Sequence, residues 1–123
     1  MLFKLSYYGR KIVTIADPHI RKNDTNMIYE IFKRLENSTG EEDKLLIRDP
    51  YKYSFDDDTF VGDCWPGVSV WPDFFQKRVR QIWSSFYAYN SLPLSDLNFH
   101  SWIDMNEPSV FDRPELTFPK EVL

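Results

Sequence analysis

Residues 11–18 read KIVTIADP, and this stretch decides which fold class the sequence favours. The run from 11 to 16 is short, mostly apolar and rich in β-branched residues, and both of its faces are apolar apart from Thr14. Such a strand is typical of a parallel sheet that is covered on both sides. Asp17 and Pro18 end the strand, because proline lacks the amide hydrogen that a sheet ladder needs and also restricts the residue before it.

The flanking sequence predicts that helices alternate with strands. Apolar residues at helical spacing predict two helices, over residues 26–36 and from the cap at 73 to about 89, and Gly9 indicates a preceding helix whose tail is residues 2–8. Alternating residues predict a second strand over residues 97–103, with a shorter one over 45–47 and an irregular loop from 56 to 67. We expect Gly9 to end the first helix and Asp73 to cap the third at its N-terminus.

Alternating strands and helices indicate βαβ units, and therefore an α/β fold with a parallel sheet. The 123 residues suffice for one ordinary domain but fall short of the ~250 residues of a (β/α)₈ barrel. The sequence shows no repeat and no domain boundary, and it begins inside one unit and ends after another. We therefore expect a piece of a larger domain.

The amino-acid composition excludes several classes of protein. A net charge of −4 argues against a nucleic-acid partner, and one cysteine rules out an internal disulfide. No apolar run approaches the ~18 residues of a membrane-spanning helix, and the first ten residues lack the layout of a signal peptide. Aromatic residues make up 17% of the chain, so they need either a large core or a stacking surface.

Three clusters combine acidic or aromatic residues, at 17–20, 62–67 and 102–108. The first and third follow predicted strands, where parallel barrels carry their catalytic groups. A carboxylate beside an indole suits a sugar, because the indole packs on the apolar face of the ring and the carboxylate faces the anomeric carbon. Each cluster alone also has a plain structural reading, as a strand end, a packed turn or a helix cap.

Read together, residues 102–111 (WIDMNEPSVF) closely resemble the nucleophile signature of glycoside hydrolase family 31. Residues 9–20 (GRKIVTIADPHI) resemble the third barrel strand of that family, and residues 64–67 (CWPG) resemble its aromatic loop. The tail at 113–120 (RPELTFPK) is similar to the neutral α-glucosidases within the family. The three motifs occur in the family's order and span nearly the whole chain.

The resemblance implies a partial (β/α)₈ TIM barrel, about strands 3 to 4 with their helices and loops, so that residues 1–123 form part of one catalytic barrel. Asp104 matches the catalytic nucleophile. Asp17 and His19 match strand-end supports, and Glu107 matches a residue that orients the nucleophile loop. Five further residues match walls of the pocket for the terminal glucose: Ile20, Trp65, Trp102, Met105 and Phe111.

The implied reaction is retaining hydrolysis of an α-glucosidic bond without a metal or other cofactor. Asp104 would attack the anomeric carbon, and a second carboxyl about 5–5.5 Å away would serve as acid and then base. The family places that second residue on a later strand, well downstream of the motif. We therefore expect the isolated chain to be inactive.

The resemblance further implies an oligosaccharide or N-glycan substrate, a regulatory β-subunit and the lumen of the endoplasmic reticulum. Two glycosylation sequons, at residues 23–25 and 37–39, are compatible with that compartment. Neither a nucleic acid nor a membrane is an expected partner. Two alternatives stay open, namely a non-catalytic carbohydrate-binding module and a truncated gene product without a function of its own.

Overall fold

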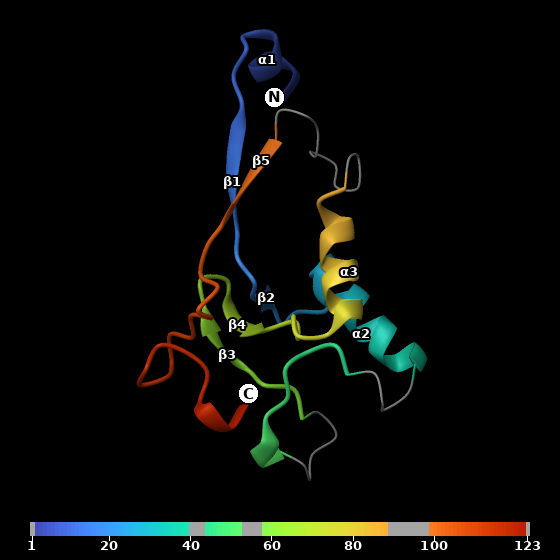
Figure 1. The fold of residues 1–123 in the computed structure, drawn as a ribbon, viewed down its shortest axis with the longest axis vertical. Helices are drawn as coiled ribbons and strands as arrows, with labels where there is room; N and C mark the ends of the chain where they lie inside the picture. The colour runs from blue at the N-terminus through green and yellow to red at the C-terminus, as the bar shows by residue number, and fades with distance from the viewer. Residues whose placement is uncertain (1, 40–43, 53–57, 89–98, 123) are drawn as a thin grey trace.

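The computed structural model describes residues 2–39, 44–52, 58–88 and 99–122 (Figure 1). Its helices are α1 (Leu2–Tyr7), α2 (Met27–Thr39) and α3 (Lys77–Phe86), with single 3₁₀ turns at Pro50–Lys52 and Lys120–Val122. Its strands are β1 (Ile12–Ala16), β2 (Ile20–Arg21), β3 (Gly62–Cys64), β4 (Gly67–Val70) and β5 (Phe99–Ile103). Within these ranges, no helix has the length and apolar character to cross a membrane.

β1 and β5 form a parallel pair although most of the chain separates them in sequence. Ile12 lies opposite Phe99, and Ala16 lies opposite Ile103. Both intervening helices, α2 and α3, lie on the same side of the pair in Figure 1. The two predicted strands and their parallel pairing are confirmed, except for residues 97 and 98, which lie outside the described residues. The described residues form no closed barrel.

A second sheet corrects the prediction of an irregular loop over residues 56–67. β2, β4 and β3 form a three-stranded antiparallel sheet in that order. Cys64 pairs with Gly67, so Trp65 and Pro66 are the two residues of a tight hairpin turn. Gly67 has a φ of +91°, a conformation that glycine adopts without steric cost. The Pro-Gly pair that suggested a loop therefore supplies the second turn residue of a hairpin and the first residue of β4. Residues 56 and 57 lie outside the described residues.

The short strand predicted at 45–47 is replaced by isolated bridges, one of which joins Leu46 to Pro72. A side chain of α2 explains the difference. Glu36 Oε1 accepts hydrogen bonds from the backbone amides of Leu45 (2.6 Å) and Leu46 (2.9 Å). Arg48 donates to the same oxygen at 2.5 Å. Because the carboxylate takes up these two amides, they are not available to a strand ladder.

One predicted helix end agrees with the structure and two differ, since α2 continues to Thr39 rather than ending at residue 36 and α3 begins later than predicted. Gly9 has a φ of +65° and follows α1, as predicted. The Asn26 side chain caps α2 by accepting the amide hydrogen of Tyr29 at 3.0 Å. Asp73 does not cap α3, which begins at Lys77 with Gln76 at the cap position. Its carboxylate instead accepts the Phe75 amide and the Gln76 side-chain amide, so it stabilises a turn before the helix.

Two apolar clusters make up the core. The first joins β2, β4, α2 and α3 through Ile20, Tyr29, Phe32, Leu45, Leu46, Val70 and Val79. The second joins the β3–β4 hairpin to the chain after β5 through Phe60, Cys64, Trp71, Val110 and Phe118. Rings of Phe60, Trp71 and Phe118 lie 5.0–5.7 Å apart, so part of the high aromatic content is core.

One face of the β1–β5 pair differs from the sequence prediction. The sequence indicated a strand covered on both sides, yet Val13 is 64% exposed and Ile15 is 55% exposed. Trp102, opposite Ile15 in the register, is 56% exposed. These side chains share one face of the pair because successive residues of a strand alternate between faces. On the other face the residues of β1 are half-buried, but Ile103 of β5 is 72% exposed, so the described residues cover that face only in part.

Candidate active site

Asp104 stands where the sequence analysis placed it, directly after the last paired residue of β5. The corresponding position after β1 is Asp17, since Ala16 and Ile103 are partners in the parallel register. The carboxyl ends of parallel strands share one edge of a sheet, where catalytic groups collect in α/β barrels. Asp104 is half-buried, and Met105 next to it has a φ of +58°. A left-handed backbone is costly for a side chain of this kind and is found mostly at functional sites.

The loop that follows Asp104 is tied to β3. The Phe111 amide donates to the carbonyl oxygen of Asp63 at 2.8 Å, and the Asp63 amide donates to the Asp112 carboxylate at 2.9 Å. Val110 is fully buried between these contacts. Cys64 adds a weaker bond from its Sγ to the carbonyl oxygen of Ser109, at 3.7 Å. The hairpin thereby fixes the loop that carries the candidate nucleophile.

Gly62 permits this close approach, and the sequence analysis missed it. A Cβ atom at position 62 would lie 2.6 Å from Cγ1 of Val110 and 3.3 Å from the ring of Trp71. The first distance is shorter than real Cβ contacts allow, so either the loop or the hairpin would have to move. A glycine inside a strand is the available sequence signal for such a close backbone approach.

Two of the predicted pocket-wall residues come together. The rings of Trp65 and Phe111 lie 4.9 Å apart at 85°, an edge-to-face arrangement. Trp65 stands on the hairpin turn and is 73% exposed, so its ring is available to a ligand. Met105 packs against the second core cluster and is half-buried. Trp65, Phe111 and Met105 therefore surround the tethered loop.

The other two pocket-wall residues lie elsewhere. Trp102 is on the exposed face of β5, one residue before Ile103 at the strand end. Ile20 is only 4% exposed and belongs to the first core cluster, with Phe32 and Val70. Ile20 is thus packed in the core of the described residues, and its role as a pocket wall stays a prediction.

The three predicted supporting residues, Asp17, His19 and Glu107, lie in the segments that follow β1 and β5. Nε2 of His19 is 3.6 Å from Oδ2 of Asp17, and the His19 side chain is buried. Burial lowers the pKa of His19 below 6.5, while the nearby Asp17 carboxylate opposes that shift. Within the described residues, Nδ1 of His19 and Oδ1 of Asp17 are buried and have no partner. The Ser109 hydroxyl donates to the Glu107 carboxylate at 2.8 Å. Two hydrogen bonds lower the pKa of this carboxyl, of which the bond from the backbone amide of Glu107 has the larger effect and the bond from Ser109 the smaller.

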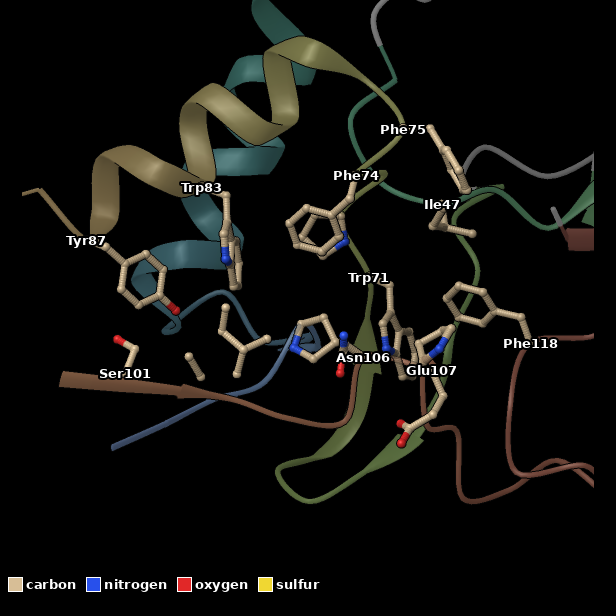
Figure 2. A pocket seen from close by; sticks show the side chains of 15 residues that line it. Ile47, Trp71, Phe74, Phe75, Trp83, Tyr87, Ser101, Asn106, Glu107 and Phe118 are labelled. Carbon is tan, nitrogen blue, oxygen red and sulfur yellow. The ribbon is translucent and has the colours of Figure 1, made fainter. Parts of the chain in front are cut away.

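A cavity of about 710 Å³ lies between the β1–β5 pair and α3 (Figure 2). Its walls are mainly aromatic, and Figure 2 shows Trp71, Phe74 and Trp83 pointing into it. Asn106 and Glu107 lie on one side, and Tyr87 faces Ser101 on the other. Because Ser101 and Ile103 both line the cavity, Trp102 between them faces the opposite side of the sheet. The cavity therefore lies on the side of the sheet opposite Trp102, with Asn106, Glu107 and Pro108 of the loop after Asp104 in its wall, and the sequence analysis did not foresee it.

No three His, Cys, Asp or Glu side chains converge to hold a metal ion in the part of the chain that the structure describes. The chemistry that the arrangement supports is that of a carboxylate on a fixed loop beside exposed aromatic rings. Such a set can bind a sugar ring and act on its anomeric carbon.

Comparisons with known proteins give the family. The chain is 38% identical to the Glucosidase 2 subunit alpha of Saccharomyces cerevisiae over 124 aligned positions, which cover all of this chain and 11% of that protein. A crystal structure of a glucosidase II alpha subunit in its alpha3-Glc2-bound form superposes with a TM-score of 0.78 at 34% identity. That match covers 97% of this chain and 12% of the crystallised one.

A further solved structure is an ER glucosidase II heterodimeric complex of the catalytic subunit and the binding domain of the regulatory subunit. It matches with a TM-score of 0.76 at 35% identity, over 97% of this chain and 12% of its own. This chain thus spans about an eighth of the length of these relatives. The model of the glycosyl hydrolases family 31 TIM-barrel domain matches residues 1–122. The expected family is confirmed, and the chain belongs to glycoside hydrolase family 31, within its TIM-barrel domain.

Proposed function

We propose that residues 1–123 are the nucleophile-bearing part of the single catalytic barrel of a retaining α-glucosidase. The observation that carries this proposal is the position of Asp104. It follows a parallel strand directly, on a loop that two hydrogen bonds tie to β3 and that contributes Phe111 to the Trp65–Phe111 pair. Carboxylates at strand ends and aromatic rings beside them are what glycoside hydrolysis on a barrel requires.

In the proposed reaction, a carboxylate oxygen of Asp104 attacks C1 of an α-linked glucose and displaces the leaving oxygen. A second carboxyl group, about 5–5.5 Å away, protonates that oxygen and later removes a proton from the water that hydrolyses the glycosyl-enzyme. We place this second group outside these 123 residues, and the isolated chain therefore does not turn over. Trp65, Trp102 and Phe111 pack against the sugar, and Ile20 and Met105 complete the pocket wall.

The proposed substrate is an oligosaccharide or N-glycan with terminal α-linked glucose, acted on in the lumen of the endoplasmic reticulum. Two comparisons support this. The yeast relative is a Glucosidase 2 subunit alpha, and a matching solved structure is an ER glucosidase II complex. That complex also contains the binding domain of a regulatory subunit, which supports a β-subunit as a partner of the whole protein.

The test traps the intermediate in the full-length protein. A 5-fluoroglucosyl fluoride slows hydrolysis of the glycosyl-enzyme, and mass spectrometry of the digest locates the label. We expect the label on the peptide that contains Asp104. A label on any other peptide contradicts the assignment, and a protein that binds glucosides without being labelled favours a carbohydrate-binding module.

A substitution makes the same test independent of labelling. Asp104→Ala lowers kcat by about a thousandfold or more, because the covalent step has no nucleophile. Added azide then attacks C1 directly, and a single displacement on an α-glucoside gives the β-glucosyl azide. Glu115→Ala, which removes an exposed carboxylate from the same segment, is the matched control, and it gives no azide product. Near-normal activity of Asp104→Ala would remove this residue from the mechanism.

A further inference from the structure

The sequon at residues 23–25 forms a closed turn between β2 and α2. The backbone amide and the Oγ1 hydroxyl of Thr25 each donate to Oδ1 of Asn23 at 2.8 Å. The amide of Asn26 donates to the carbonyl oxygen of Asn23, also at 2.8 Å. The hydroxyl of the third sequon residue is thereby held against the carboxamide of the first.

The reactive atom of this turn has no hydrogen-bond partner among the described residues. Both bonds from Thr25 use Oδ1, and the Nδ2 nitrogen of Asn23 makes no hydrogen bond to any described residue. Asp24 and Thr25 are exposed, and Asn23 is partly exposed. The Asp24 carboxylate pairs with Nζ of Lys33 at 3.0 Å, which partly offsets its negative charge beside the carboxamide. Nδ2 is therefore uncommitted in a turn whose other two residues are exposed.

The second sequon has a different local structure. Asn37 is exposed, but residues 37–39 lie inside the last turn of α2, where Ser38 donates its hydroxyl to the carbonyl oxygen of Leu35. Residues two apart on a helix do not share a face. The second sequon therefore lies on helical backbone where the first forms a turn, and it serves as an internal comparison.

We propose that Asn23 is an N-glycosylation site that accepts an oligosaccharide from a lipid diphosphate carrier. The inference rests on the lumenal location in the proposed function, where such carriers are used. Nδ2 of Asn23 forms a bond to C1 of the first sugar while the bond from C1 to the diphosphate oxygen breaks. The lipid diphosphate leaves with that electron pair, and Nδ2 gives up one proton to a base of the transferase.

The folded turn can accommodate a glycan attached to Asn23. Attachment at Nδ2 leaves Oδ1 as a carbonyl oxygen, so both hydrogen bonds from Thr25 persist after the transfer. The glycan would stand at the N-terminal end of α2, away from both core clusters, to which residues 23–25 contribute no side chain. Modification at this position therefore requires no rearrangement of the described fold.

The test uses the full-length protein from a eukaryotic secretory host. Release of N-glycans by a peptide N-glycosidase in ¹⁸O-labelled water converts each occupied asparagine to labelled aspartate, which mass spectrometry locates. We expect the label at residue 23. Asn23→Asp keeps an oxygen that accepts both Thr25 bonds but has no amide nitrogen, so this variant loses one glycan without losing the turn.

Variants at Thr25 separate the hydroxyl from the packing of the side chain. Thr25→Val removes the hydroxyl at nearly constant shape and is expected to lose the same glycan, while Thr25→Ser keeps it. Unlabelled residue 23 in the lumenal protein overturns the inference, and so does occupancy at Asn37 that equals or exceeds occupancy at Asn23. Hydrolysis of an α-glucoside is measured on the same preparation. An active enzyme without a glycan at 23 overturns this inference alone, and a glycosylated protein without activity overturns only the proposed function.

Discussion

The antiparallel sheet β2–β4–β3 and the parallel pair β1–β5 differ in how far the described residues cover them. The antiparallel sheet packs on α2 and α3 on one side and on the chain after β5 on the other, and Ser69, Val70 and Trp71 are at most 1% exposed. The parallel pair leaves Val13, Ile15 and Trp102 more than half exposed. Apolar surface that is removed from water stabilises a fold by about 25 cal/mol per Å². The first region is therefore stabilised by its own contacts, whereas the second needs further strands.

The family membership explains the difference. In a barrel of this kind each strand pairs on both edges and its inner face packs against the other strands. β1 and β5 are neighbours in that arrangement, and their exposed face carries Trp102 just before the candidate nucleophile. The hairpin is not part of the parallel sheet, and its role is to hold the loop after β5. We call the β3–β4 hairpin with its core cluster the clamp, because its own contacts stabilise it and hold the loop after β5. We call the β1–β5 pair the barrel wall, because further strands complete its packing.

The largest expected effect is a loss of stability in the clamp, the β3–β4 hairpin and its core cluster. Trp71 is 1% exposed and its ring lies within 5.7 Å of the Phe60 and Phe118 rings. Trp71→Ala in the full-length protein should lower the free energy of unfolding of this region by about 3–5 kcal/mol. Hydrogen exchange followed by mass spectrometry measures this at β3 and β4. Trp71→Phe is the control, because it keeps a ring and removes an indole N–H that has no partner among the described residues. Equal losses for both variants would contradict the packing argument.

The second effect differs between the 123-residue chain and the full-length protein, so it tests whether other strands cover the β1–β5 pair. Ile15 is 55% exposed in this chain. Ile15→Ala should therefore change the free energy of unfolding of the 123-residue chain by no more than about 0.5 kcal/mol. In the full-length protein, the same substitution should cost about 2–5 kcal/mol, because the residue is then buried by other strands. Chemical denaturation of both proteins gives the two values. A small effect in the full-length protein would show that no strand covers this face.

The third effect concerns the junction between the two regions. Gly62→Ala places a Cβ atom 2.6 Å from Cγ1 of Val110. Overpacking of this kind costs about 1–3 kcal/mol, and the displaced loop carries Asp104. We expect kcat on an α-glucoside to fall more than KM changes, because the nucleophile is displaced. Gly67→Ala is the comparison, since its Cβ meets no atom within 4 Å and the cost comes only from its φ of +91°. If both variants lower kcat equally, contact with Val110 is not what positions the loop.

Local signals account for the parts that the sequence predicted. The β-branched run of β1, the alternation in β5 and Gly9 after α1 each depend on neighbouring residues alone, so their elements were found. The short strand at 45–47 was not, because Glu36 from a different element takes the amides of Leu45 and Leu46. Asp73 has the chemistry of a cap, but its hydrogen bonds with Phe75 and Gln76 delay the helix by a turn.

In the candidate site, too, some residues could be identified from the sequence and others could not. Asp104 and its aromatic neighbours lie within contiguous motifs, and sequence alone was enough to single them out. Gly62 could not be found so easily, because what it must avoid is Val110, a residue far along the chain. The uncovered face of β1 was also unpredictable, because the run of apolar residues indicates only that a strand needs cover. Which residues supply that cover is a property of the whole domain.

The smallest expected effect is a pH dependence at the edge between the two regions. Burial lowers the pKa of His19 below 6.5, and Asp17 partly opposes this. The unfolded chain therefore binds a proton at higher pH than the folded one, so the stabilising contribution of neutral His19 is present above about pH 6.5. It is lost as the pH falls from there through the folded-state pKa, with a slope of at most about 1.4 kcal/mol per pH unit.

Urea denaturation of the full-length protein between pH 5 and 8 measures this slope, and His19→Phe should flatten it while keeping a ring near Trp71. Asp17→Asn acts in the opposite direction. It removes the carboxylate that raises the pKa of His19, so the folded-state pKa falls further. The loss of stability then extends over a wider range, down to a lower pH. A slope unchanged in both variants would show that His19 does not titrate with unfolding. A slope flattened by Asp17→Asn would mean that the carboxylate, rather than burial, governs the pKa of His19.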